Sequence, residues 1–143
     1  MDFIDILEVA HDICINKMDR IVCGSLGLIL QKELPVTRSL GDLDLIVPNS
    51  RAMFDLFSEM DLCANIRAGS FPSDVPHYQV DYGGISICIF EVMPIQTKIC
   101  CGLRIQLAED IWRVKEEYAK KNLYKHEQDL LQRDKKLTEN IPY

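Results

Sequence analysis

The spacing of apolar residues changes along this chain between the period of a helix and the period of a strand. Residues 3–16 carry apolar side chains at helical spacing with acidic residues on the opposite side. Residues 42–47 (DLDLIV) alternate acidic and apolar side chains, as the two faces of a strand require. Helices that alternate with short strands are typical of a mixed domain. The predicted fold class is therefore α/β (α+β), with a small mixed β-sheet flanked by helices.

The same patterns predict the bounds of the other elements. Helices are expected at 3–16, 26–34, 51–62, 107–123 and 125–137, and strands at 20–23, 42–47, 78–80, 85–93 and, more weakly, 103–105. Residues 64–76 contain glycine and proline and have no period, which indicates a loop. This loop is either a lid or acceptor contact or a plain surface loop.

Length and charge limit the functions that the chain can serve. Its 143 residues fit one domain, 1–143, with a core at about 18–106 and C-terminal helices at about 107–138. A net charge of −6 argues against a broad nucleic-acid-binding surface. The chain has no apolar run of membrane-spanning length, and its first residues are acidic where a signal peptide is basic. We therefore expect a cytoplasmic protein that does not contact membranes.

The chain has six cysteines, which first suggest a disulfide framework. However, most of them lie in apolar segments such as ISICIF, and no pair has the spacing of a zinc site. A chain of this length also needs no covalent staple to fold. Reduced thiols in the core are the expected state.

Asp42 and Asp44 are the first candidates for chemistry. They are two residues apart on a predicted strand, so both carboxylates leave the same face, with about 6–7 Å between their Cα atoms. Two acids this close repel each other unless a cation lies between them, and Mg²⁺ is a natural oxygen-bound partner. The pair therefore suggests a metal site, although this spacing of two acids is by itself only a weak indication of one.

Gly24 and Ser25 lie where a predicted strand ends and a helix begins. Free N–H groups at a helix start bind anions, and glycine lets a phosphate approach the backbone. The alternative is an ordinary turn in which Ser25 caps the helix. The lysine of a Walker A loop is absent.

Glu91 is the third candidate acid, at the end of the predicted strand 85–93. It shares strand parity with Ile87 and Ile89, so its carboxylate leaves an apolar face. If this strand lies beside DLDLIV, three acids converge and a two-metal site is the economical explanation. Otherwise, Glu91 merely lies at a solvent-exposed strand end.

These residues together resemble the nucleotidyltransferase fold of the DNA polymerase beta-like superfamily. The segment VCGSLGLILQKELPVTRSLGDLDLIV is most similar to the minimal bacterial, abortive-infection or toxin-type members, which have Gly-[Gly/Ser], a helix and then Arg-x-Ser-x-Asp-x-Asp. Arg38 and Ser39 match this pattern, with one additional residue before Asp42. Three later segments also resemble the family. The strand of its third carboxylate is matched by IFEVMP, and the helix whose lysine faces the nucleotide is matched by LAEDIWRVKEEYA, with Lys115 as that lysine. A further signature of the family is matched by KHEQDL, which begins at Lys125.

The resemblance implies metal-dependent transfer of a nucleoside monophosphate from an NTP to an acceptor hydroxyl. It assigns Asp42, Asp44 and Glu91 to two Mg²⁺ ions, with Mn²⁺ as a substitute. It assigns six residues to the nucleotide: Gly24, Ser25, Arg38, Ser39, Lys115 and Lys125. The acceptor it implies is a tRNA, a protein or a small molecule, and a partner protein is a further expectation.

Three other interpretations compete with this one. Cys23-Gly24-Ser25-Leu26-Gly27 is close to the GxSxG elbow of hydrolases, with His77 or His126 as the base, but an α/β-hydrolase sheet needs more strands. A non-catalytic, antitoxin-like module could bind a nucleotide or a partner with the same fold. The expected set of three acids argues against this second interpretation, since a decayed site tolerates the loss of one. The third is an unrelated α/β domain with a chance motif.

Overall fold

The computed structural model describes residues 2–60, 67–68, 77–93, 96–121 and 125–139, except for the side chains of residues 67, 68, 121 and 125–127. The described helices are α1 (Phe3–Cys14), α2 (Gly24–Leu30), α3 (Ser50–Met60), α4 (Ala108–Lys121) and α5 (Lys125–Thr138). The described strands are β1 (Ile21–Cys23), β2 (Leu43–Val47), β3 (Arg67–Ala68), β4 (His77–Tyr82), β5 (Ile85–Glu91), β6 (Thr97–Cys100) and β7 (Leu103–Gln106). None of the described helices combines the length and apolarity that a bilayer crossing needs.

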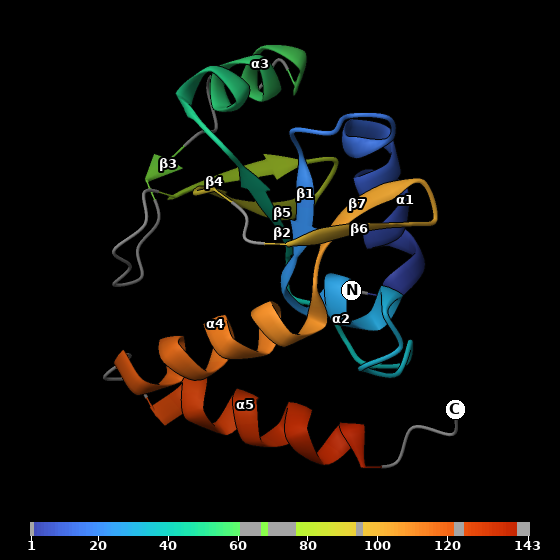
Figure 1. Cartoon of the computed structure of the whole chain (residues 1–143), viewed down its shortest axis with the longest axis vertical. Helices are drawn as coiled ribbons and strands as arrows, with labels where there is room; N and C mark the ends of the chain where they lie inside the picture. Colours follow the sequence, from blue (N-terminus) through green and yellow to red (C-terminus); the bar gives the residue numbers. More distant parts are fainter. Residues whose placement is uncertain (1, 61–66, 69–76, 94–95, 122–124, 140–143) are drawn as a thin grey trace.

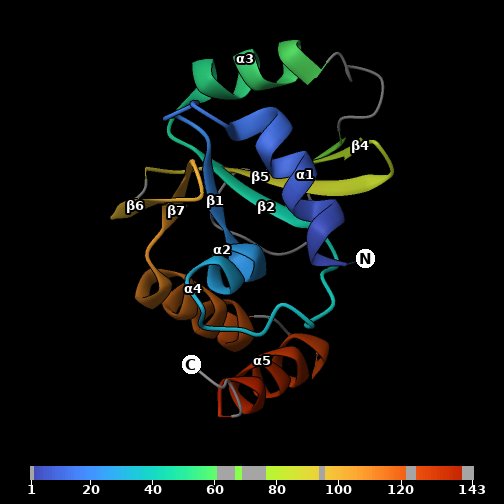
Figure 2. The ribbon, with the colours of Figure 1, turned by 90° about the vertical axis from the view of Figure 1, so that its right-hand side faces the viewer.

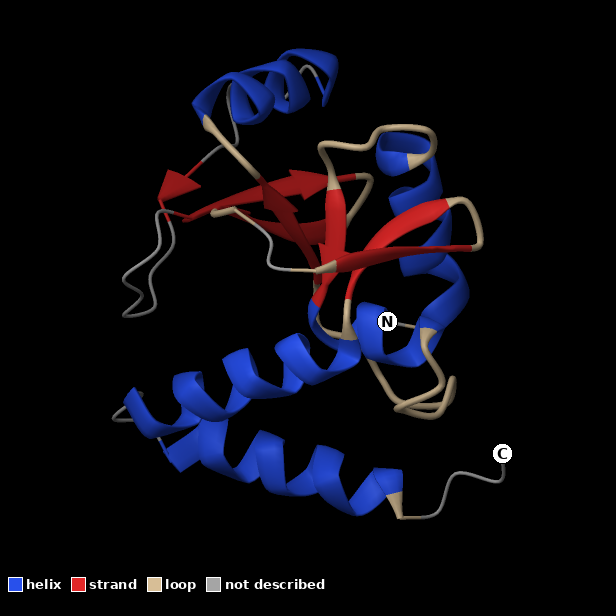
Figure 3. Cartoon of the chain, in the orientation of Figure 1, coloured by secondary structure: helices blue, strands red, loops and turns tan. Residues whose placement is uncertain are grey.

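The strands form one mixed sheet in the order β3-β4-β5-β2-β1-β7-β6 (Figures 1 and 3). β2 pairs antiparallel with β1 and parallel with β5, so it lies between the strand that precedes the Gly24 turn and the predicted third-acid strand. The predicted α/β fold with a small mixed sheet is confirmed. The centre of this sheet brings together segments that are far apart in the sequence.

The two faces of the central strands differ in character. Leu43, Leu45 and Val47 of β2 point into the main core, which also holds buried side chains of α1, α2 and α3. Figure 2 shows α1 lying over this side of the sheet. Because side chains alternate along a strand, Asp44 and Ile46 face the other side, where Ile46 forms only a small buried cluster with Ile21 and Cys23. The apolar face fixes the register, and the register places Asp44 on the opposite face.

Helices α4 and α5 form an antiparallel pair beside α2 (Figure 1). Gly27 of α2 makes this packing close, because a Cβ atom there would lie 2.8 Å from Cδ1 of Ile111 in α4. The C-terminal helices are thereby held next to the start of α2. This position becomes important for the site.

The structure corrects some of the predicted bounds. The second helix begins at Gly24 rather than at residue 26 and ends at Leu30. β6 was not expected, because TKIC is polar and short, and it is stabilised by antiparallel pairing with β7. Part of the predicted loop 64–76 forms β3, which pairs with β4, and the rest of that loop lies outside the described residues.

Five cysteines lie among the described residues, and all five are free thiols. Cys14, Cys23 and Cys88 are buried, Cys100 is half-buried and Cys101 is exposed. Burial raises the pKa of the Cys14 thiol to about 12, as expected for a thiol that packs in the core. The prediction of thiols in the core is confirmed for Cys14, Cys23 and Cys88 but not for the exposed Cys101, and Cys63 lies outside the described residues.

Candidate functional site

Two carboxylates and a thiol meet on the less covered face of the sheet. Asp42 precedes β2, Asp44 lies within it, and Cys88 is the direct neighbour of Asp44 on β5. One ligand atom from each residue lies within 4.8 Å of the other two. The Cys88 thiol donates a hydrogen bond to Oδ2 of Asp42, with an Sγ to Oδ2 distance of 3.3 Å. The structure therefore joins the two predicted acids and adds a sulfur atom to them.

The backbone of Gly24 lies directly against the Asp44 carboxylate. Cys23, the preceding residue, pairs with Asp44 across the two strands. Gly24 has a φ of +63°, and a Cβ atom there would lie 2.1 Å from Oδ2 of Asp44. Glycine is needed here for two reasons, the left-handed backbone and the missing side chain. The turn that was predicted from Gly24-Ser25 is thus in contact with the predicted acid pair.

The acid pair carries an electrostatic penalty. Burial and the neighbouring charge of Asp42 raise the pKa of the Asp44 carboxyl to about 8, against a usual value of 3.8. Lys115 and Arg38 lower this pKa only in part. Burial, followed by the charges of Asp44 and Asp42, also raises the pKa of the Cys88 thiol well above its usual range. A divalent cation would relieve this repulsion.

We expect the affinity of this pair for a divalent cation to rise with pH. The ion displaces the proton that Asp44 holds below pH 8, so affinity should rise by about tenfold or more per pH unit between pH 6 and 8. Calorimetric titration with Mn²⁺ in two buffers of different ionisation enthalpy measures both the affinity and the proton released. Affinity that does not change between pH 6 and 8 would contradict the raised pKa.

A group of paired charges lies beside the Gly24 turn. Lys115 of α4 donates to Oγ of Ser25, with an Nζ to Oγ distance of 3.1 Å. Asp134 of α5 lies 3.8 Å from Lys115 Nζ and accepts two hydrogen bonds from Arg38, at 3.1 and 3.2 Å. The Asp134 side chain is only 2% exposed. The structure thus brings three predicted nucleotide residues together around a buried carboxylate.

The two acids of the Asp-Asp-Cys group (Asp42, Asp44 and Cys88) fit a divalent ion of the kind that the resemblance implies. Asp42 and Asp44 offer carboxylate oxygens from one face, and the raised pKa of Asp44 marks the absence of a compensating charge. The third donor is a thiol, which suits a softer ion than Mg²⁺. The Asp-Asp-Cys group can bind a metal, and the identity of the ion is a separate question.

Glu91 does not join this group. It pairs with Val47, three positions along β2 from Asp44, which corresponds to about 10 Å at the usual strand rise. Its side chain accepts a hydrogen bond from Oγ of Ser50 at 2.5 Å. The expected convergence of three acids is therefore corrected. The parity of Glu91 was assigned properly, but that parity belongs to the face opposite to Asp44.

The structure describes two further predicted residues, Ser39 and Lys125, in less detail. Ser39 is exposed, and its carbonyl oxygen accepts a hydrogen bond from Arg38. Lys125 begins α5, and its side chain lies outside the described residues. The structure therefore adds nothing to the assignment of Lys125.

The hydrolase interpretation finds no support in the arrangement. Ser25 follows β1, whereas His77 begins β4, and β2 and β5 lie between these two strands. His77 stacks on Phe90, with ring centroids 5.2 Å apart, and Ser25 contacts Lys115. His126 has no described side chain.

Sequence reasoning missed Cys88 and Asp134. The signal for Cys88 is its strand parity, which is opposite to that of the apolar Ile87 and Ile89 on either side. Asp134 lies three residues after Leu131 and three before Leu137, so an acid interrupts an apolar helical stripe. Both signals were present, but each needed the neighbouring strand or helix to be interpreted.

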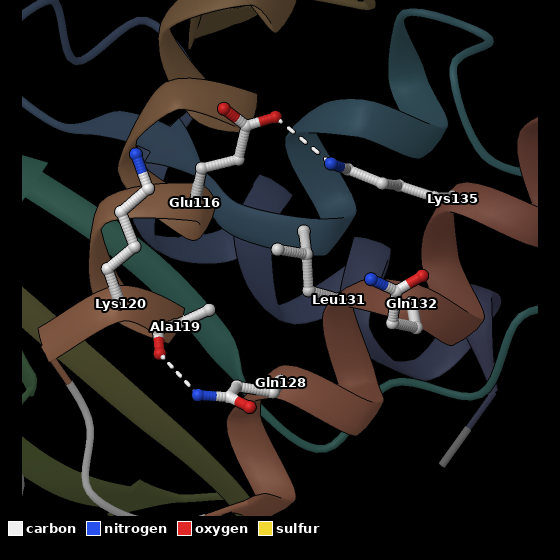
Figure 4. A pocket seen from close by; sticks show the side chains of 7 residues that line it. All are labelled: Glu116, Ala119, Lys120, Gln128, Leu131, Gln132 and Lys135. Atoms are coloured by element: carbon white, nitrogen blue, oxygen red, sulfur yellow. Dashed lines mark hydrogen bonds and ion pairs between the residues drawn. The ribbon is translucent and has the colours of Figure 1, made fainter.

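A groove of about 330 Å³ lies between α4 and α5. Figure 4 shows Leu131 in it, with an ion pair of Glu116 and Lys135 on one side and a hydrogen bond from Gln128 to the Ala119 carbonyl on the other. Its lining comes from these two helices and includes none of the Asp-Asp-Cys group. The groove is thus separate from the Asp-Asp-Cys group.

Comparison with family models finds no match, and comparison with curated proteins finds none either. Three solved structures are similar. TM1012 of Thermotoga maritima, a proposed nucleotidyltransferase, has a TM-score of 0.63 and 14% identity, over 84% of this chain and 88% of its own. ANT(2″)-Ia, crystallised with adenylyl-2″-tobramycin, has a TM-score of 0.54 and 16% identity, over 94% of this chain and 84% of its own. JHP933 of Helicobacter pylori has a TM-score of 0.51 and 16% identity, over 79% of this chain and 55% of its own. This chain therefore has a nucleotidyltransferase fold.

Proposed function

We propose that this protein is a metal-dependent nucleotidyltransferase. It transfers a nucleoside monophosphate from an NTP to an acceptor hydroxyl and releases pyrophosphate. The observation that carries the proposal is the meeting of Asp42 and Asp44 beside the Gly24 backbone, with Lys115 on Ser25 next to it. An acid pair next to a glycine turn and a cation is the arrangement that a metal-bound triphosphate needs.

The residues would divide the work of phosphoryl transfer. Asp42 and Asp44 would hold a divalent ion, which supplies charge neutralisation at the triphosphate. The Gly24 turn and Ser25 would seat the terminal phosphates, because the first N–H groups of α2 have no partner within the helix. Lys115 would contribute positive charge to the same phosphates. In the reaction the acceptor oxygen bonds to the α-phosphorus, the bond to the pyrophosphate oxygen breaks, and the hydroxyl proton passes to solvent water.

The acceptor is the least specified part of the proposal. ANT(2″)-Ia was crystallised with an adenylylated aminoglycoside, so a small molecule with free hydroxyl groups is the first acceptor class to test. A tRNA and a protein follow, as the resemblance to toxin-type members suggests, and an RNA would need a local basic patch on a chain of net charge −6. A partner protein that completes acceptor binding belongs to the same proposal.

A second function is favoured by one specific observation. Among the described residues, the group contains no third carboxylate, because Cys88 lies beside the pair and Glu91 lies elsewhere. A site that lacks this acid would still bind a nucleotide but would transfer it poorly. The alternative is therefore a non-catalytic, antitoxin-like module that binds a nucleotide or a partner.

One assay tests both functions. The protein is incubated with each of the four NTPs labelled at the α-phosphate, Mg²⁺ or Mn²⁺, and an aminoglycoside panel, total tRNA or cell extract. We expect labelled acceptor to form, and we expect none to form when EDTA is present from the start of the reaction. Nucleotide-induced thermal stabilisation without labelled product would support the binding module instead. If no NTP gives labelled product or thermal stabilisation, both the transferase and the nucleotide-binding module are overturned.

A further inference from the structure

Cys88, the third donor of the Asp-Asp-Cys group, is held in place by the pairing of β5 with β2. Cys88 is 6% exposed, and its neighbours Ile87 and Ile89 are fully buried in the core on the other face of β5. The parallel pairing with β2 places Cys88 opposite Asp44. Its thiol cannot turn into the core without a change of strand register.

The sulfur atom is also hydrogen-bonded from a second side. Nε2 of Gln79, the partner of Cys88 on β4, donates to Cys88 Sγ at 3.8 Å. Residues around a metal centre orient its ligands through contacts of this kind. Cys88 thus has a supporting contact of the kind found for ligating side chains.

The donor chemistry of this group differs from that of a site built for Mg²⁺ alone. Mg²⁺ prefers oxygen ligands in octahedral geometry and retains several waters. Thiolate favours zinc-class ions, and catalytic zinc sites hold the ion with three protein ligands and leave a fourth position open. Two carboxylates and one thiol within 4.8 Å supply three such ligands.

We propose that Asp42, Asp44 and Cys88 form a three-ligand site for a zinc-class divalent ion, with the fourth position open to water or a phosphate oxygen. As the metal–sulfur bond forms, the Cys88 proton passes to solvent. The choice of a phosphate oxygen as the fourth ligand rests on the proposed function. The choice of a zinc-class ion rests on the three side chains alone. The thiol replaces the third acid that the sequence led us to expect, and it changes which ion the site selects.

Cobalt tests this site, because Co²⁺ occupies zinc sites and reports sulfur ligation in its absorption spectrum. Titration of the full chain with Co²⁺ should give a near-ultraviolet sulfur-to-cobalt charge-transfer band, and Zn²⁺ should abolish it by displacement. Cys88→Ser should lose the band. Cys101→Ser is the matched control, because it removes one thiol of the vicinal Cys100–Cys101 pair, whose Sγ atoms lie 3.9 Å apart, and it should retain the band.

Substitution by aspartate tests selectivity directly. In Cys88→Asp, the ratio of the Mn²⁺ affinity to the Co²⁺ affinity should rise by about 10–100-fold or more. A change around a metal ligand typically has an effect of this size. Circular dichroism and thermal melting establish that each variant folds, and Cys88→Ala replaces Cys88→Ser if the latter does not. An unchanged preference in Cys88→Asp would overturn the inference.

The spectrum separates this inference from the proposed function, because it requires no turnover. Bound Co²⁺ without the sulfur band in the wild type, no Co²⁺ binding, or a band that persists in Cys88→Ser would overturn the zinc-class site. A Cys88-dependent band in a protein that transfers no label would overturn the nucleotidyltransferase proposal and leave the metal site standing.

Discussion

Replacement of Asp44 by asparagine is expected to stabilise the metal-free protein while it abolishes metal binding. The pKa of Asp44 is about 8 in the folded chain and near its usual 3.8 in the unfolded chain, so the folded state binds more protons between these values. The stability of the wild type should therefore fall as pH rises from 4 to 8. Asparagine carries no charge, so the gain from Asp44→Asn should be negligible at pH 4 and about 1–3 kcal/mol at pH 8.5.

The same substitution should reduce nucleotidyl transfer by at least about 10²–10³-fold, the usual effect of removing a group that stabilises transition-state charge. Urea unfolding at pH 4, 7 and 8.5 without metal measures the stability, and the labelled-NTP assay measures transfer. Asp81→Asn is the matched control, an exposed acid on β4 that should change neither quantity. A loss of stability in Asp44→Asn at pH 8.5, or transfer at the wild-type rate, would contradict the role of Asp44 in a metal site.

Replacement of Asp134 by alanine is expected to destabilise the fold by about 3–5 kcal/mol, because it leaves Arg38, Lys115 and the half-exposed Arg133 without their counter-charge. Arg38 and Lys115 are 10% and 24% exposed, so water compensates them only in part. The substitution also removes the only described contact that joins α5 to the residue Arg38. We expect Lys115 to move away from Ser25 as a result.

A matched control lies on the same helix pair. Glu116 of α4 and Lys135 of α5 form an ion pair at 3.3 Å, with both side chains nearly half exposed (Figure 4). Glu116→Ala should therefore cost less than about 1 kcal/mol. Urea unfolding of both variants measures the difference, and Asp134→Asn, which keeps a hydrogen-bond acceptor, serves if Asp134→Ala does not fold. Equal losses for Asp134→Ala and Glu116→Ala would show that the buried carboxylate has no special part.

The local sequence determined much of the fold and, at the site, the positions of Asp42, Asp44 and Gly24. The two-residue alternation of DLDLIV fixes Asp42 and Asp44 on one face, because the apolar side chains between them must enter the core. Gly24 was identified from its place between a strand and a helix, and the structure gives the physical reason, the approach of the Asp44 carboxylate to its backbone. Both features depend on residues that are close together in the sequence, which is why they can be predicted from it.

Pairing between distant segments decided the rest. The period-2 pattern puts Glu91 on the core face with Ile87 and Ile89, but which residue of β5 lies beside Asp44 depends on the register of β5 against β2, which that pattern does not fix. Asp134 is 96 residues from Arg38, and only the packing of α4 and α5 beside α2 brings these two charges together. The sequence by itself therefore determined the fold class and the acid pair. The tertiary structure decided the third ligand and the buried counter-charge, because both arise from contacts that no local pattern encodes.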